Sequence, residues 1–194
     1  RQEHIGDETV RLEKLRASAG NWTRAQSQSL HDLSRDQQSL TGETSQLAEK
    51  LAGAQTFRFV LDAAAREMTG VVDRLAGRDC GEATQRMEQN VLSRLKRLVE
   101  AMKEDKPPPG DSQGGGGSGG SGSKAGQPGG SIRALAELKL IKLMQDDLNR
   151  RTQQLGETIG DREPTDSEQA ELSQLAKEQG QLAELMLGLV GGQQ

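Results

Sequence analysis

The chain has 194 residues, of which 28% are charged, 32% hydrophobic and only 2% aromatic, and its formal net charge at pH 7 is −4. Because aromatic side chains supply much of the buried area in an ordinary core, this composition favours narrow seams between helices. The sequence has no apolar run long enough to span a bilayer, and its slight negative charge argues against a nucleic-acid-binding surface.

Residues 7–52 are predicted to form one long helix. Apolar residues recur along it at alternating spacings of three and four, with one additional spacing of four between Trp22 and Leu30. This is the pattern of a heptad seam with a single stutter. Asp7 is the expected N-cap of the helix.

A second helical pattern follows a short turn and ends at Met102. It is interrupted at 77–81, where Asp79 followed by Glu82 resembles a capping box. Long helices joined by a short turn lie antiparallel. Residues 1–106 are therefore predicted to form a long helical hairpin whose second arm is interrupted near 77–81.

The three aromatic residues are possible anchors for a partner. Trp22 lies in the apolar stripe of the first helix, where it either anchors the hairpin or forms an exposed patch for a partner helix. Phe57 and Phe59 lie near the turn, where they either close the tip of the hairpin or present an exposed apolar end to another protein.

Charged clusters are expected to lie on solvated helix faces. The basic stretch 94–97 has Glu88 and Glu100 within two turns, which favours a mixed-charge surface over a nucleic-acid site. Asp146 and Asp147 point about 100° apart on a helix, so a solvated face is expected there rather than a cation site.

The stretch 107–130 is rich in glycine, proline and serine and is predicted to be a disordered linker between two helical parts. A chain of this composition and length has a root-mean-square span of roughly 25–30 Å.

Residues 131–190 are predicted to form a helical hairpin, followed by a short tail at 191–194. Its loop at 160–164 precedes a capping box formed by Thr165 and Glu168. Facing residues should have numbers that sum to about 324. The residues of this predicted interaction seam are Leu138, Ile141, Gln145, Leu148, Leu175, Gln179, Leu182 and Met186.

Gln145 and Gln179 fall opposite each other in this register. Two facing glutamines can hydrogen-bond to each other and penalise a slipped register. The alternative is that both lie at the edge of the seam in water.

Residues that carry catalysis are scarce, with two histidines and one cysteine in the whole chain. No spacing typical of a metal site or of a nucleophile and its base is present. We therefore expect no enzymatic activity, no cofactor and no bound metal.

Four segments carry a resemblance to known proteins, namely 81–85, 135–140, 149–152 and 178–183. They are similar to the C-terminal portion of helical, envelope-associated bacterial proteins that have no assigned activity. The resemblance implies a non-catalytic coiled-coil character and an export signal upstream, hence a periplasmic or secreted protein. Without the resemblance, a cytoplasmic location is the alternative.

The sequence as a whole predicts an all-α structural or interaction protein. Its C-terminal hairpin is expected to dock helix to helix on the longer pair, on a second copy or on another helical protein. The alternative is a regulatory or accessory subunit of a membrane or envelope complex.

Overall fold

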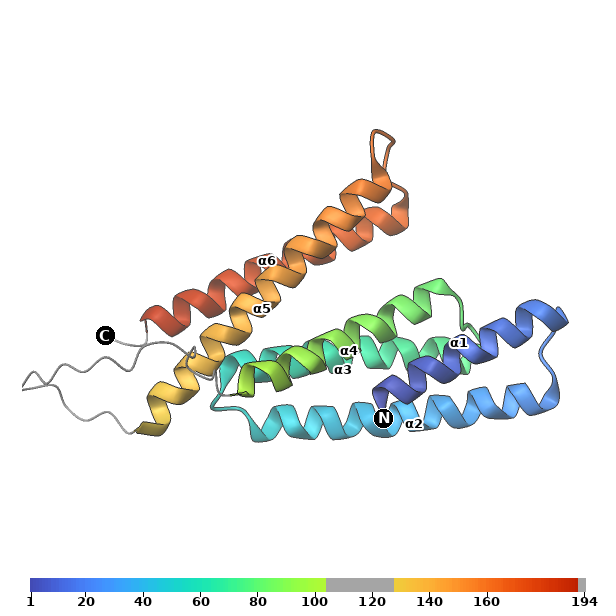
Figure 1. Ribbon diagram of the computed structural model, residues 1–194, viewed down its shortest axis with the longest axis horizontal. Coiled ribbons are helices and arrows are strands. Elements are labelled where there is room, and N and C mark those ends of the chain that lie inside the picture. The colour runs from blue at the N-terminus through green and yellow to red at the C-terminus, as the bar shows by residue number, and fades with distance from the viewer. Residues whose placement is uncertain (104–127, 192–194) are drawn as a thin grey trace, which may run out of the picture.

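The computed structural model describes residues 1–103 and 128–191, and every regular element in these ranges is an α-helix (Figure 1). The predicted all-α class is therefore confirmed. The helices are α1 (Gln2–Ala19), α2 (Arg24–Lys50), α3 (Gln55–Ala76), α4 (Glu82–Met102), α5 (Pro128–Ile159) and α6 (Asp166–Gly191).

The predicted single helix over 7–52 is wrong, because the chain turns back between α1 and α2. Gly20 ends α1 with a φ of 79°, in the left-handed region that favours glycine. Thr23 then begins α2 with a capping box, in which Gln26 exchanges hydrogen bonds with it. The apparent stutter after Trp22 is thus the start of a new helix. The helix α1 begins at Gln2, so Asp7 lies inside it rather than at its N-cap.

Helices α1 to α4 form a four-helix bundle instead of the predicted long hairpin. Each helix packs against the next one in the chain, and α4 closes the bundle against α1. Figure 1 shows the four helices side by side. Seven buried residues form the core at the end with the α3–α4 turn, and they are Ile5, Leu12, Leu30, Leu33, Val71, Leu75 and Cys80.

The predicted break at 77–81 is present, but its local chemistry differs from the expected capping box. Asp79 accepts hydrogen bonds from the backbone N–H of Gly81 (2.9 Å) and from Arg74 (2.7 Å). The residue at the N-cap of α4 is Gly81, which provides no side-chain cap. Asp79 therefore stabilises the turn that reverses the chain, which makes α3 and α4 antiparallel neighbours.

Helices α5 and α6 form the predicted C-terminal hairpin. The capping box before α6 is confirmed, because the N–H of Thr165 donates to Glu168 (2.8 Å) and the N–H of Glu168 donates back to Thr165 (3.4 Å). The helix α5 starts at Pro128, three residues before the predicted start. The rest of the predicted linker, 107–127, lies outside the described residues.

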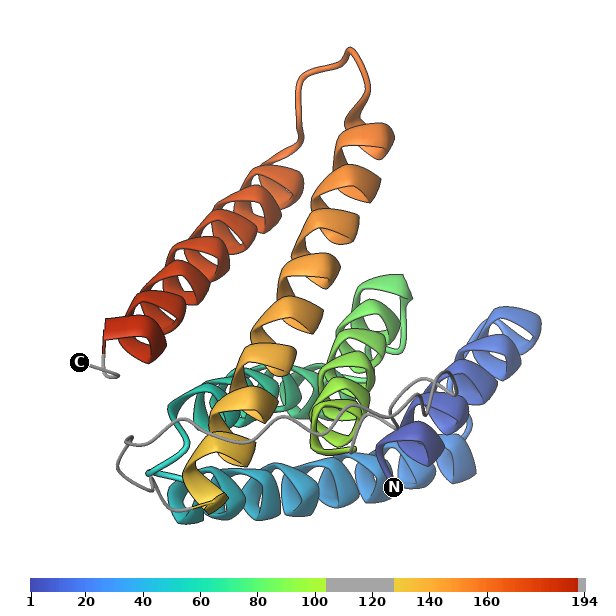
Figure 2. The ribbon, with the colours of Figure 1, turned by 60° about the vertical axis from the view of Figure 1, so that its left-hand side comes forward.

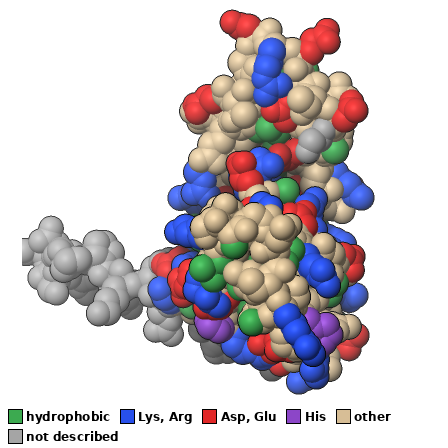
Figure 3. Space-filling model, turned by 90° about the vertical axis from the view of Figure 1, so that its right-hand side faces the viewer, with side chains coloured by type: hydrophobic (Ala, Val, Ile, Leu, Met, Phe, Trp, Pro, Cys, Tyr) green, Lys and Arg blue, Asp and Glu red, His purple; other side chains and the backbone are tan. Residues whose placement is uncertain are grey.

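The hairpin crosses the bundle and extends away from it. Its helix α5 packs on α3 and α4, whereas α6 packs mainly on α5. In Figure 2 the loop between α5 and α6 lies at the end of the hairpin far from the bundle. The face in Figure 3 carries interspersed basic and acidic side chains on both parts. The hairpin therefore meets the bundle along one limited contact.

Candidate functional site

The contact between hairpin and bundle has an apolar centre. Leu140, Ile141 and Met144 of α5 are at most 6% exposed and belong to one core cluster with α3 and α4 residues. The bundle residues of that cluster include Phe57, Val60, Leu61, Leu98 and Ala101. Burial of these side chains gives the contact its non-directional attraction.

At one end of this centre, Glu137 of α5 lies at the N-terminus of α3. Its Oε2 accepts a hydrogen bond of 3.3 Å from the backbone N–H of Thr56. The residue at the N-cap of α3 is Ala54, which has no side-chain cap to offer. Free N–H groups and the positive end of the helix dipole favour a carboxylate at this position. The hairpin therefore caps a bundle helix.

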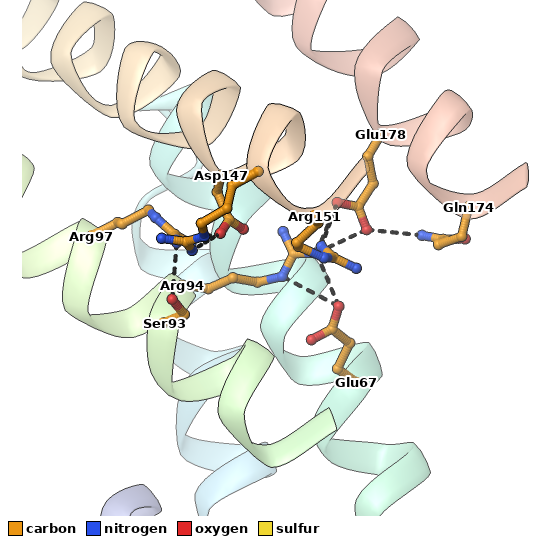
Figure 4. Close-up of polar contacts among 9 residues, drawn as sticks. Glu67, Ser93, Arg94, Arg97, Asp147, Arg151, Gln174 and Glu178 are labelled. Atoms are coloured by element: carbon orange, nitrogen blue, oxygen red, sulfur yellow. Dashed lines mark hydrogen bonds and ion pairs between the residues drawn. The ribbon is translucent and has the colours of Figure 1, made fainter. Parts of the chain in front are cut away.

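At the other end, Arg94 of α4 connects three helices. Its guanidinium lies 2.9 Å from Glu67 on α3 and 2.8 Å from Glu178 on α6, and its side chain is 5% exposed. Glu178 also accepts hydrogen bonds from Gln174 (3.1 Å) and from Arg151 (3.4 Å). Figure 4 shows the two carboxylates on opposite sides of Arg94. Arg94 therefore links α6 to the bundle by an ion pair.

A second ion pair lies beside the first. Arg97 of α4 donates to Asp147 of α5, and Asp147 also accepts from Arg150 on its own helix. The side chains of Arg97 and Asp147 are 14% and 8% exposed. Ser93 accepts a further hydrogen bond from Arg97 at 2.9 Å. The charges of α4 and of the hairpin are therefore complementary along the contact.

Burial and pairing act in opposite directions on these groups. Burial lowers the pKa of Arg94, but the charges of Glu67 and Glu178 outweigh this effect and raise it above its ordinary value. Burial raises the pKa of Glu178, but the charge of Arg94 outweighs this effect and lowers it. For Arg97, burial outweighs the charge of Asp147 and lowers the pKa. Pairing thus favours the ionised forms of Arg94 and Glu178.

The ion cluster leaves little free space. The cavity beside it measures about 10 Å³ and is lined by Val60, Arg94, Arg97, Met144, Asp147, Leu148 and Glu178. This volume is at the lower limit for one water molecule. The cluster therefore resembles a closed protein–protein contact more than a pocket for a small molecule.

The predicted seam of the hairpin is present in part. Leu148, Leu175 and Leu182 are buried, as is Ile141, whereas Leu138 and Met186 are 36% and 44% exposed. Both exposed residues lie at the base of the hairpin, where α5 turns part of its apolar surface toward the bundle instead of α6. Leu140 and Met144 are buried apolar residues of α5 that the predicted seam did not include.

Gln145 and Gln179 face each other in the predicted register. Each amide donates to the other at 3.0 Å, and the pair lies in contact with solvent. Both interpretations of the sequence thus apply at once, because the glutamines pair at the edge of the seam.

The three possible anchor residues lie within the chain's own packing. Phe57 is 7% exposed in the core cluster, and Phe59 packs against that cluster while partly exposed. Trp22 lies in the α1–α2 connection and packs partly against the other core cluster. Phe57 therefore closes the end of the bundle under α5, as the first of the two interpretations proposed.

Two charged stretches are corrected by the structure. Arg94 is buried in the cluster, the Arg97 side chain is largely covered there, and Asp147 is 7% exposed rather than on an open face. A signal was present in the sequence, because Glu178 lies between the seam residues Leu175 and Leu182 at spacings of three and four. Ionised side chains at core positions on separate helices indicate buried partners of opposite charge.

We also searched the described ranges for a metal site, a reactive cysteine and a membrane-spanning helix. There, no three His, Cys, Asp or Glu side chains form a group that could hold a metal ion. Cys80 is 1% exposed, and burial followed by the charges of Glu13, Glu88 and Asp79 raises its pKa to about 12. None of the helices within 1–103 and 128–191 is long and apolar enough to cross a membrane.

Fold and site together define an all-α protein in which a helical hairpin docks on a four-helix bundle through a buried ion cluster. The chain matches no family model, no curated protein and no solved structure. The resemblance to envelope proteins, and the location that it implies, stay predictions.

Proposed function

We propose that this chain is a non-catalytic structural and interaction protein that binds helices with helices. The observation that carries this proposal is the contact of the α5–α6 hairpin with α3 and α4. It combines an apolar centre with a helix cap from Glu137 and two ion pairs centred on Arg94 and Arg97.

The composition of this contact supports the proposal. Interfaces between separately folded units mix apolar and charged groups more than the interior of a single bundle does. The hairpin adds most of its contact through one helix and one further carboxylate, Glu178. A helix pair of the same chemistry on another protein would satisfy the same bundle surface.

Cross-linking in the source cells tests the proposal. Lys139, Lys142 and Lys177 lie on the hairpin, and we expect them to give recurrent links to another copy or to one foreign helical protein. Mixing ¹⁴N- and ¹⁵N-labelled chains separates links within a copy from links between copies. Links confined to single chains, in cells and in concentrated solution, would contradict the proposal. A recurrent membrane-protein peptide would favour the accessory-subunit alternative.

A further inference from the structure

The two helices of the hairpin pack against each other. Leu148, Leu155, Leu175 and Leu182 are each at most 7% exposed, and the Gln145–Gln179 pair joins the same two helices. The Thr165–Glu168 capping box fixes the start of α6. The leucines also belong to the core cluster that the hairpin shares with the bundle, but the Gln145–Gln179 pair and the capping box lie within the hairpin. We therefore expect α5 and α6 to stay together when the hairpin leaves the bundle.

The bundle surface under α5 needs specific groups to cover it. It has the buried Arg94 and the largely covered Arg97, with Glu67 as the bundle carboxylate bonded to Arg94. It also has the N-terminus of α3, which lacks a side-chain cap of its own. Left uncovered, this surface would expose an apolar patch that includes Val60 and Leu61.

The hairpin meets these needs with one spaced pattern. On α5, Glu137 and Asp147 are ten residues apart, or about 15 Å along a helix, and the apolar residues Leu140, Ile141 and Met144 lie between them. Glu178 on α6 adds the carboxylate for Arg94. The matching ligand is therefore an amphipathic hairpin with carboxylates at both ends of its apolar face.

We propose that the α5–α6 hairpin of one copy docks on the α3–α4 surface of a second copy, and that the two copies exchange hairpins reciprocally. This inference rests on the proposed function and names the partner as a second copy of the chain. The second copy carries every group that the bundle surface requires, in the same spacing.

Concentration sets the balance between the closed monomer and the exchanged dimer. The contacts are identical in both forms, so they do not favour either. Two linked modules meet at an effective concentration of about millimolar. Dilute chain should be monomeric, and dimers should form where the local concentration approaches that value.

Complementary charge reversal tests the exchange. In Arg97→Glu and in Asp147→Arg, each chain places like charges at its own contact. In an equimolar mixture, a mixed dimer with exchanged hairpins has two contacts. At one contact the unchanged Arg97 meets the unchanged Asp147, and at the other the introduced glutamate meets the introduced arginine. Both contacts of the mixed dimer therefore pair opposite charges. If each mismatch weakens docking about tenfold, the dissociation constant of the mixed dimer falls from about millimolar to about ten micromolar. Arg150, whose side chain is 58% exposed, can turn into solvent, away from the arginine introduced by D147R.

Sedimentation velocity at about 100 µM gives the readout. We expect monomers for each variant alone and a dimer for the mixture. The control chain carries R97E and D147R together and should be a closed monomer, with its Thr56 amide protected from hydrogen exchange as in the wild type. Circular dichroism verifies that the variants are folded.

Two results would overturn the inference. A monomeric mixture, with the double variant closed, shows that the hairpin docks but does not exchange, which leaves the proposed function intact. A double variant with an unprotected Thr56 amide shows that the Arg97–Asp147 pair does not hold the hairpin. The wild type gives a test that needs no substitution, because its dimer fraction should rise between about 100 µM and about 1 mM.

Discussion

Glu88 on α4 and Glu178 on α6 are each 3% exposed, yet their pKa values move in opposite directions. Glu178 faces Arg94 and Arg151, and its pKa is lowered. Glu88 accepts a hydrogen bond of 2.7 Å from Thr9 on α1, and burial raises its pKa to about 7. Depth of burial is therefore not enough to describe a buried carboxylate, because the neighbouring cation decides its charge.

The two regions differ in what they hold together. The Glu178 cluster joins the hairpin to the bundle, whereas Glu88 lies between α1 and α4 inside the bundle. Thr9 also approaches the carbonyl of Ile5 at 3.0 Å, so its single proton has two acceptors. A protonated Glu88 can donate to Thr9 and leave the Thr9 proton for Ile5. The ionised form loses one of these hydrogen bonds.

Removing the cation from the Glu178 cluster should have the largest effect. In Arg94→Met, Glu178 and Glu67 lose their shared partner, and we expect a loss of about 3–5 kcal/mol in the free energy of unfolding. R94M together with Glu178→Met should recover most of it. Urea unfolding measures both. The control is Arg58→Met on the exposed side of α3, with an expected change below about 0.5 kcal/mol. A loss below about 1 kcal/mol for R94M would contradict the role of Arg94.

Changing pH should separate the two regions next. The folded state holds the Glu88 proton more tightly than the unfolded chain does, because its pKa is about 7 rather than 4.5. The contribution of Glu88 to the free energy of unfolding should therefore be complete below about pH 4.5 and fall by on the order of 3 kcal/mol as pH rises to about 7. Urea unfolding across this range measures the slope. Glu88→Gln should remove it, and an unchanged slope in E88Q would refute the assignment to Glu88.

The Glu178 cluster should respond in the opposite sense. Because its pKa is lowered in the folded state, its contribution is present above the ordinary glutamate pKa and is lost as pH falls below that value. The hairpin should therefore leave the bundle in acid while Glu88 favours a packed α1. The two contacts can be distinguished by comparing the hydrogen-exchange rate of the Thr56 amide with that of the Thr9 amide between about pH 3 and 6.

Removing the cap that the hairpin gives to α3 should have a smaller effect. Glu137→Gln loses the charge that faces the N-terminus of α3, at an expected cost of about 1 kcal/mol. The Thr56 amide, which donates to Glu137, should also exchange faster. Glu184→Gln, at an exposed position on α6, is the matched control. Equal effects of the two substitutions would show that Glu137 acts only through net charge.

Replacing Gln145 and Gln179 by leucine should give the smallest change. The pair lies at a partly exposed edge of the seam, so two leucines add buried apolar surface there. They also remove the hydrogen bonds that favour this register of the two helices. We expect a Tm rise of about 2–4 °C, equivalent to about 1 kcal/mol. A fall in Tm would show that the hydrogen-bonded pair stabilises the hairpin more than apolar packing does.

The helical class and the C-terminal hairpin could be predicted because their signals are local. Heptad spacing, the Thr165–Glu168 capping box and the loop at 160–164 together set the register that brings Gln145 to Gln179. The bundle was missed for the opposite reason. Apolar spacing continues across Gly20, and the reversal there depends on a left-handed glycine and on the Thr23 cap, which a periodicity count passes over.

The docking contact was missed because it depends on pairs distant in sequence. Arg94 and Glu178 are 84 residues apart, and each alone is typical of a solvated helix face. Their positions in apolar stripes were visible, but the partner of each was not. The helix α5 also buries two apolar faces, one against α6 and one against the bundle, so its apolar surface is wider than the predicted seam.

The reactivity of Cys80 can be used to measure local unfolding of the bundle. This residue is the single cysteine, it is buried in the core at the α3–α4 turn, and its thiol has a pKa of about 12. The thiolate is the form that reacts with alkylating reagents, so the closed bundle should resist them. The alkylation rate of the unmodified protein therefore measures how often this end of the bundle opens, without any introduced label.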